Sequence, residues 1–365
     1  MINPIVPGMM NPVVVGMSGG VDSAVAALLL HREGIPVVGV FMKNWDEQDA
    51  DGHCAADQDW SDVRAVCDHI GIPYYNVNFT KQYWDNVFTL CLDEFRKGRT
   101  PNPDVLCNRE IKFKVFLEYS LKVGGGGIAT GHFCQTNEAG ELLRGFDPLK
   151  DQSYFLYMLK REQLKRTLFP VGGLTKARVR EIARENGLPV ADKRDSTGIC
   201  FIGERRFKEF LQKYLPAQPG SMRDRATGEK VGRHDGLMYY TLGQRRGLGI
   251  GGGKTGGEGR WFVMSKELDT NTLWVMQGLD TPELHSRQAR CVETSWINSN
   301  PPSGEFRCAA KFRYRQDDQA VRVVITADGL IVESDEPQRA LTPGQSVVFY
   351  DGELCLGGAI IDTVI

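Results

Sequence analysis

The chain has 365 residues, which is too long for one simple hydrophobic core, so two or three domains are expected. Its hydrophobic content of 41% and charged content of 25% are ordinary for a globular protein. No apolar run approaches the ~18 residues of a membrane-spanning helix, the first residues lack a signal-peptide pattern, and the 9 scattered cysteines form no Cys-x-x-Cys pair. These features exclude a membrane-spanning protein and a disulfide scaffold, and they favour reduced thiols in the cytoplasm.

The net charge of −2 hides a strong asymmetry along the chain. Residues 1–149 hold 12 Lys and Arg against 19 Asp and Glu, and residues 261–365 hold 9 against 15. Residues 150–260 instead hold 23 against 12. A middle segment this basic predicts a polyanionic partner. Solvated helix faces would give the same composition, so charge alone leaves both interpretations open.

The first predicted elements form a strand, a glycine-rich turn and a helix. The apolar run Pro12–Met17 predicts the strand, Ser18-Gly-Gly-Val-Asp-Ser23 forms the turn, and the pattern over Asp22–Glu33 predicts the helix. The two glycines allow close approach of an anion, and the helix start supplies unpaired N–H groups and a positive dipole end. A Walker A loop would need a Gly-Lys-Ser/Thr ending, which is absent. The sequence therefore predicts a phosphate-binding turn without lysine, against the alternative of an ordinary strand-to-helix turn.

Strand and helix patterns alternate over about the first 200 residues, which predicts an α/β fold with a parallel sheet covered by helices. The polar stretch from Lys43 to Asp59 is expected to be a long loop at the carboxyl edge of the sheet, where ligands bind in such folds. Further strands are expected at Pro36–Met42, Tyr74–Asn78 and Gly127–Thr130, and further helices at Gln58–Ile70, Tyr83–Lys97, Ile111–Val123 and Lys176–Asn186.

The remaining sequence changes character twice. A short helix is expected at Phe207–Leu215, followed by turn-rich sequence, and short alternating runs predominate after about residue 285. Asp-Gly turns separate these runs, which predicts a small β-barrel. We expect a catalytic α/β domain at residues 1–205, a small mixed central domain at 206–282 and a C-terminal β-barrel domain at 283–365. The cluster Gly247–Thr255 satisfies G-x-G-x-x-G, but no apolar strand precedes it, so a flexible basic loop is expected there.

Two cysteines stand in unusual settings. Cys107 follows Thr100-Pro-Asn-Pro-Asp104, and a helix is expected to begin just after it, which would favour the reactive thiolate. Cys200 follows a polar run and lies between Gly198 and Gly203, as expected for a thiol on a mobile loop. Cys67, Cys91, Cys134, Cys291, Cys308 and Cys355 stand in apolar or alternating contexts that predict small buried side chains.

Several motifs together resemble the bacterial tRNA-specific 2-thiouridylases, which belong to the PP-loop ATP pyrophosphatase superfamily. The resemblance covers nearly the whole chain. It is carried by the runs Gly16–Ser23, Phe41–Trp45, Asn102–Asp104, Cys107–Phe113, Ala129–His132, Lys150–Phe155, Asp195–Cys200 and Thr241–Gly247.

This resemblance implies an adenine-nucleotide-binding catalytic domain and assigns roles to individual residues. ATP is expected at Gly16, Met17, Ser18, Gly19, Gly20, Val21, Asp22, Ser23, Met42 and Gly131. The target base is expected at Asn102, Pro103 and Asp104, with Asp104 as acid/base, Cys107 as nucleophile or resolving thiol and Cys200 as persulfide carrier. Contacts with tRNA are expected at His132, Lys150, Asp151, Gln152, Arg313, Tyr314 and Gln345.

The implied reaction is ATP-dependent 2-thiolation of the wobble uridine of tRNA. Adenylation makes the C2 oxygen a leaving group, a cysteine persulfide supplies sulfur, and a second thiol releases it by forming a disulfide. The base must leave its stack to react, and the basic middle segment would hold the phosphate backbone. Magnesium is expected with the nucleotide rather than on protein ligands. The implied partners are the tRNAs for Lys, Glu and Gln and a sulfur-relay protein or cysteine desulfurase.

Two other functional classes are weighed against this one. A PP-loop ligase acting on a small molecule would release pyrophosphate without tRNA and need no Cys200, whereas a non-catalytic RNA-binding protein would not turn over ATP. The basic segment and the paired cysteine motifs count against the first, and the intact Ser18–Ser23 turn counts against the second. Ligation of an iron–sulfur cluster by Asp104, Cys107 and Cys200 stays open as a different means of sulfur delivery.

Overall fold

A five-stranded parallel sheet forms the first part of the molecule, which confirms the predicted α/β fold. The computed structural model describes residues 11–46, 55–195, 207–250, 259–278, 282–298 and 302–365. The strands lie in the order β3-β2-β1-β4-β7, and each neighbouring pair is parallel. Their bounds are β1 Val13–Met17, β2 Val37–Lys43, β3 Tyr74–Asn78, β4 Gly127–Ala129 and β7 Thr167–Leu168.

Helices cover both faces of this sheet because its strands are apolar on both sides. Val13 and Val15 of β1 belong to one buried cluster and Val14 to another, as expected when successive side chains point to opposite faces. The first cluster packs against α1 Val21–Arg32, α2 Ala55–Ile70 and α8 Lys176–Glu185. The second packs against two segments, α3 Thr80–Tyr83, η1 Trp84–Phe88 and α4 Thr89–Arg96, and α5 Pro103–Cys107, η2 Asn108–Val115 and α6 Phe116–Lys122.

The second of these segments corrects a prediction. The helix expected to begin after Cys107 begins at Pro103, and Cys107 is the last residue of α5. Asn102 caps this helix, because its side-chain oxygen accepts from the N–H groups of Asp104 and Val105 at 3.2 and 3.3 Å. Both segments also contain a π-helical stretch, η1 and η2, which the sequence pattern did not indicate. Such stretches are frequent at functional sites.

A mixed four-stranded sheet follows, in the order β10-β11-β8-β9, with β11 and β8 parallel and the other neighbours antiparallel. This confirms a small mixed sheet in the middle of the chain. The bounds are α9 Phe207–Gln212, β8 Gly220–Asp224, β9 Lys230–His234, β10 Arg260–Glu267 and β11 Thr272–Gly278. The predicted glycine-rich loop lies partly outside the described residues, since residues 251–258 are not described.

The C-terminal strands close into the predicted barrel. Their order is β12-β15-β14-β13-β16-β17, and β12 also pairs with β17. Two short strands from the first part of the chain, β5 Cys134–Thr136 and β6 Leu142–Arg144, extend the same sheet through the pairing of β6 with β17. The bounds are β12 His285–Trp296, β13 Glu305–Lys311, β14 Gln319–Thr326, β15 Gly329–Arg339, β16 Ser346–Asp351 and β17 Leu354–Val364.

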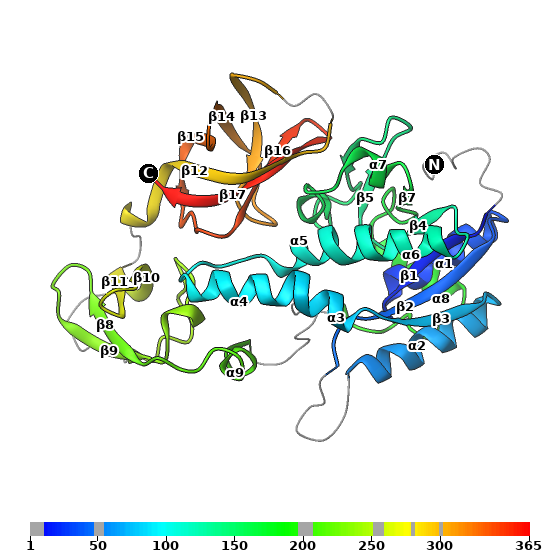
Figure 1. Ribbon diagram of the computed structural model, residues 1–365, viewed down its shortest axis with the longest axis horizontal. Coiled ribbons are helices and arrows are strands. Elements are labelled where there is room, and N and C mark those ends of the chain that lie inside the picture. Colours follow the sequence, from blue (N-terminus) through cyan, green and yellow to red (C-terminus); the bar gives the residue numbers. More distant parts are fainter. Residues whose placement is uncertain (1–10, 47–54, 196–206, 251–258, 279–281, 299–301) are drawn as a thin grey trace.

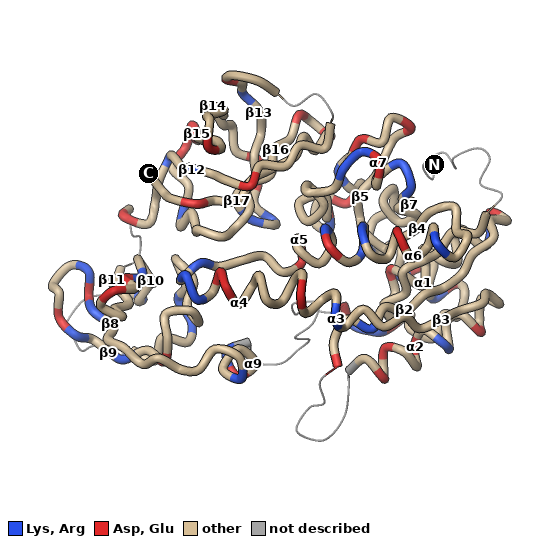
Figure 2. The backbone as a smooth tube through the Cα atoms, viewed as in Figure 1, with Lys and Arg blue, Asp and Glu red and all other residues tan. Residues whose placement is uncertain are grey.

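Figure 1 shows the parallel sheet at one end of the molecule and the mixed sheet at the other, with the barrel beside the helices between them. The Lys and Arg of the basic middle segment are not gathered in one region: some lie around α7 Arg161–Leu164, and others lie along β8 and β9 (Figure 2). No helix in the described parts of the chain is long and apolar enough to cross a bilayer.

Candidate active site

The turn Ser18–Ser23 joins β1 to α1 and is held by hydrogen bonds within the turn. The N–H of Ser18 donates to Ser23 Oγ at 3.2 Å, and Ser23 Oγ donates to the carbonyl of Gly20 at 3.1 Å. Gly19 has a φ of +71°, and a Cβ there would lie 2.7 Å from the backbone oxygen of Asp59. Glycine is therefore required at Gly19 both by conformation and by space.

A cavity of about 410 Å³ opens beside this turn. Of the residues expected to bind ATP, it is lined by Gly16, Met17, Ser18, Gly20, Val21, Asp22, Ser23, Met42 and Gly131, and Gly19 lies within the same turn. From the other expected groups it is lined by Asp104, His132, Lys150, Gln152 and Tyr314. The structure thus brings residues from five separate motifs and from the barrel to one cavity.

Gly131 shows how closely the walls of this cavity fit together. A Cβ on Gly131 would lie 2.7 Å from the backbone carbon of Asp22 and 2.7 Å from the backbone nitrogen of Ser23. The segment after β4 therefore packs directly on the start of α1, and only a residue without a side chain leaves room for the turn.

The residues expected to act on the base and the sulfur are only partly gathered here. Asn102 and Pro103 form the start of α5 and do not line the cavity, whereas Asp104 does. Cys107 is fully buried in a hydrophobic cluster rich in aromatic side chains, and it is not among the residues that line the cavity. Cys200 lies outside the described residues. The expectation that a helix start activates Cys107 is wrong, because three residues of α5 separate it from Asn102 and Pro103 at the helix N-terminus.

Three residues expected to touch tRNA make internal contacts instead of lining the cavity. The carboxylate of Asp151 accepts from the N–H groups of Gly145 and Ser153 at 3.0 and 3.1 Å and is buried. Arg313 donates to the carbonyl of Ala340 at 2.7 Å, and Gln345 donates to the carbonyl of Thr100 at 2.7 Å.

An ion cluster at one side of the cavity was not assigned from sequence. Lys176 Nζ lies 2.6 Å from Asp22 Oδ1 and 2.8 Å from Asp195 Oδ1, and Lys150 Nζ lies 2.6 Å from Asp195 Oδ2. Arg180 Nη2 adds a third cation to Asp195 at 2.7 Å. Burial opposes ionisation of Asp195, but the hydrogen bonds from Lys150 and Lys176 outweigh it and lower its pKa to about 2.

The same cluster affects Asp22 differently. Burial raises the pKa of Asp22, and the nearby Lys176 offsets part of that rise. Spacing along the chain gave no signal for the pair, because Lys176 is 154 positions away from Asp22.

Lys193 is a second cation that sequence reasoning missed. Its Nζ donates to the carbonyl of Gly19 at 3.0 Å and to Asp59 and Asp62 at 2.8 and 2.5 Å. Burial lowers the pKa of Lys193, but the hydrogen bonds with the two carboxylates outweigh it and raise the pKa. Because the peptide bond is trans and planar, turning the Gly19 carbonyl toward Lys193 turns the N–H of Gly20 the opposite way.

His132 is held as a neutral imidazole. Burial lowers its pKa well below the usual value, and its ring lies near Phe113 and Phe169, with ring centroids 5.6 and 6.4 Å away. Nδ1 lies 2.8 Å from Thr130 Oγ1. Such a histidine offers hydrogen bonds to a ligand in the cavity rather than a positive charge.

The cysteines expected to be small buried side chains are so. Cys67, Cys91, Cys134, Cys291 and Cys355 are buried and Cys308 is half-buried, without disulfide bonds. Burial raises the pKa of the Cys67, Cys91, Cys291 and Cys308 thiols to about 12, so they stay protonated and unreactive.

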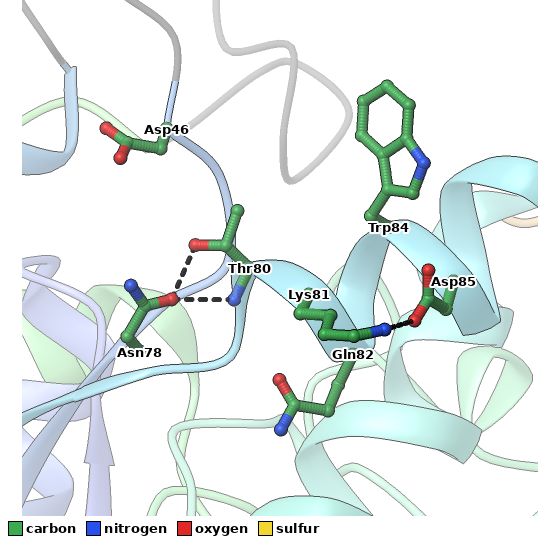
Figure 3. Close-up of a pocket in the computed structure, with 7 residues that line it drawn as sticks. All are labelled: Asp46, Asn78, Thr80, Lys81, Gln82, Trp84 and Asp85. Carbon is green, nitrogen blue, oxygen red and sulfur yellow. Dashed lines mark hydrogen bonds and ion pairs between the residues drawn. The ribbon is translucent and has the colours of Figure 1, made fainter.

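A second, wide-open hollow of about 600 Å³ lies at the start of α3 and η1 (Figure 3). Within it Asn78 Oδ1 accepts from the N–H and the hydroxyl of Thr80, and Lys81 pairs with Asp85. It shares no lining residue with the first cavity and contains none of the residues expected to be functional.

The parallel sheet, the glycine turn at its carboxyl edge and the helix that starts there define a phosphate-loop α/β protein. Three family models match in succession, described as tRNA methyl transferase HUP domain (residues 11–204), tRNA methyl transferase PRC-barrel domain (residues 208–277) and Aminomethyltransferase beta-barrel domain (residues 286–361).

Curated relatives narrow this class. The tRNA-specific 2-thiouridylase MnmA of Francisella tularensis subsp. holarctica (strain FTNF002-00 / FTA) is 57% identical over 354 residues, covering 96% of this chain and 98% of that protein. The protein of the same name from Francisella philomiragia is 56% identical over 356 residues, covering 96% and 99%. The chain belongs to the tRNA-specific 2-thiouridylase family.

Solved structures are more distant. The U34-tRNA thiolase NcsA from Methanococcus maripaludis is 18% identical, with a TM-score of 0.35 over 58% of this chain and 69% of that one. A 4-thiouridine synthetase in complex with RNA is 19% identical, with a TM-score of 0.36 over 56% and 50%.

Proposed function

We propose that this chain uses ATP to replace the C2 oxygen of a tRNA wobble uridine with sulfur, forming 2-thiouridine. The observation that carries the proposal is the single cavity that joins the Ser18–Ser23 turn to Asp104 and, from the barrel, Tyr314. Membership of the 2-thiouridylase family, at 57% identity over 96% of the chain, supports the same reaction.

ATP would bind with its phosphates at the Ser18–Ser23 turn, because the start of α1 offers unpaired N–H groups and the positive end of the helix dipole. Met42 and Gly131 would border the rest of the nucleotide. The described residues contain no group of three His, Cys, Asp or Glu suited to hold a metal ion. Magnesium would accompany the phosphates, as is usual for nucleotides.

The first chemical step would activate the base. The C2 oxygen of the flipped uridine attacks the α-phosphorus, the bond to the β-phosphate breaks, and pyrophosphate leaves. Asp104 lies on the cavity wall at the first turn of α5, and there it would accept or return a proton on the base.

The second step would deliver sulfur. The terminal sulfur of a persulfide on Cys200 attacks C2, and AMP leaves with the former C2 oxygen. Attack by Cys107 on the Cys200 sulfur then breaks the sulfur–sulfur bond, leaving 2-thiouridine and a Cys107–Cys200 disulfide that an external thiol reduces. Because Cys107 is fully buried in the free protein, this order requires α5 to shift when substrate is bound.

The tRNA would enter from the side where the barrel contributes Tyr314 and Arg315 to the cavity. Phe155 and Tyr314 have ring centroids 4.4 Å apart and offer an aromatic surface beside Gln152 and Lys150. Arg313, Asp151 and Gln345 would act by holding these segments in place. We propose tRNAs for Lys, Glu and Gln as substrates, a sulfur-relay protein or cysteine desulfurase as donor, and the three domains at residues 1–205, 206–282 and 283–365.

The test is to incubate the purified protein with unmodified tRNA, ATP and a persulfide source and to analyse the nucleosides by mass spectrometry. We expect 2-thiouridine with the natural chain, none with Cys200→Ser, and the natural yield with the matched control Cys308→Ser, whose thiol lies in the barrel strand β13. Thiolation that survives in Cys200→Ser would overturn the persulfide step.

Two further results would replace the proposed function. Pyrophosphate release that depends on a small molecule and not on tRNA indicates a ligase, and tRNA binding without ATP turnover indicates a binding protein. Stoichiometric iron in anaerobically purified protein, lost in Cys107→Ser, indicates a cluster in place of the persulfide.

A further inference from the structure

The ion cluster beside the phosphate turn contains an anion where a phosphate ligand would be expected. Asp195 lines the cavity, and its carboxylate oxygens lie 2.6, 2.8 and 2.7 Å from nitrogens of Lys150, Lys176 and Arg180. Lys176 also reaches Asp22, which belongs to the Ser18–Ser23 turn itself. The Asp195 carboxylate thus pairs with three cations at the edge of the site proposed for the nucleotide phosphates.

Among the described residues, the charges in this cluster do not balance. Lys150, Lys176 and Arg180 face only Asp22 and Asp195 among the ion pairs of the described residues, which leaves an excess of one positive charge. Asp195 stays ionised, since its pKa is about 2. A group carrying several negative charges would satisfy these cations better than a single carboxylate does.

The cations differ in how easily they can change partner. Lys150 lines the cavity and carries a compact ammonium group on a flexible stem, so it can turn to a new anion. Lys176 is buried and already divides its ammonium between Asp195 and Asp22, so it has a second partner when it leaves Asp195. Arg180 is fixed by further hydrogen bonds to the carbonyls of Ala191 and Lys193 at 3.4 and 3.1 Å. Arg180 can therefore keep Asp195 while the two lysines leave it.

We propose that Asp195 is an anionic placeholder that holds Lys150 and Lys176 beside the phosphate turn until the phosphates of ATP displace it. This rests on the proposed use of ATP at that turn. The exchange lowers the net affinity for ATP, because the ion pairs with Asp195 must break, and in return the lysines are already gathered when the nucleotide arrives.

The placeholder role predicts that removing the Asp195 charge tightens the binding of phosphate ligands, which a purely structural role would not predict. Asp195→Asn removes the competing charge, so binding of ATP and of inorganic pyrophosphate should become about three- to tenfold tighter at fixed ionic strength. Binding of adenosine, which has no phosphate, should stay unchanged. The matched control is Asp192→Asn, which removes one negative charge three positions away; the Asp192 side chain is 82% exposed and pairs with Arg184. The control should not change any of the three affinities.

Calorimetric titration of the full chain with ATP, pyrophosphate and adenosine measures these effects. Unchanged or weaker binding of both phosphate ligands in Asp195→Asn would overturn the placeholder role and make Asp195 a support for the lysines. If Asp195→Asn lowers the melting temperature, the rise in melting temperature caused by saturating pyrophosphate should still exceed that of the natural chain. A natural chain that binds neither ATP nor pyrophosphate would instead contradict the proposed function.

Discussion

The two walls of the cavity, the turn wall (Ser18–Ser23) and the α5 wall (α5 and η2), differ in how exposed their functional groups are. The wall formed by the Ser18–Ser23 turn is polar, braced by Lys193 and already surrounded by cations. The wall formed by α5 and η2 exposes Asp104 to the cavity but covers Cys107 completely. If the proposed function holds, this difference predicts an order of events in which nucleotide binds first at the turn and the Cys107 thiol is uncovered only after tRNA has entered.

The largest expected effect comes from displacing the Ser18–Ser23 turn that forms the turn wall. Gly131→Ala would place a Cβ 2.7 Å from the backbone of Asp22 and Ser23, so the turn must move. Displacements of about 1 Å in such sites cost roughly a hundredfold in rate, and we expect a loss of that size in ATP-dependent thiolation. The matched control is Gly232→Ala in β9, where the nearest atom would lie at 3.4 Å. Equal activity of the two variants would contradict the close fit.

A smaller effect is expected from destabilising the start of α5, which forms part of the α5 wall. Asn102→Ala removes the cap of α5 and should lower the free energy of unfolding by about 1 kcal/mol in urea titrations. It should also speed alkylation of Cys107, because the helix start frays more often. Thr175→Ala removes the corresponding cap of α8, where Thr175 accepts from the N–H of Arg178 at 3.2 Å. It should lower stability by a similar amount and leave the alkylation rate of Cys107 unchanged, so faster labelling in both variants would show general loosening.

The smallest effect concerns pH. A carboxylate with a lowered pKa stabilises the fold above its ordinary pKa near 4 and loses that contribution as pH falls toward its folded value. For Asp195, whose folded pKa is about 2, the stability difference between the natural chain and Asp195→Asn should stay constant between about pH 5 and pH 8 and shrink below about pH 4. Urea unfolding of both proteins across this range measures the difference. A change near neutral pH would mean that other groups control the cluster.

The sequence predicted the turn wall better than the α5 wall. The turn between β1 and α1 rests on local signals, an apolar strand, two glycines and a helix pattern, and all of these are visible within about 20 residues. The start of α5 also had a local signal, an Asn followed by Pro at the first helical position, but the interpretation placed the helix after Cys107.

Other features depend on contacts that no local pattern contains. Lys193 meets Asp59 across 134 positions and Lys176 meets Asp22 across 154, so neither pair has a spacing to recognise. The strands β5, β6 and β7 are two or three residues long and owe their existence to neighbours elsewhere in the chain. Propensity over such short runs carries almost no information.

The pairing of β6 with β17 makes the barrel a poor candidate for exchange or removal as a module. Leu142 and Leu143 pair with Cys355 and Leu354, so a cut near residue 283 would separate two strands of one sheet. The shortened chain would present the edge of β6 to solvent, and unpaired edges of this kind recruit other chains. Recombination that swaps barrels between relatives would therefore succeed only when the hairpin of β5 and β6 travels with the barrel it completes.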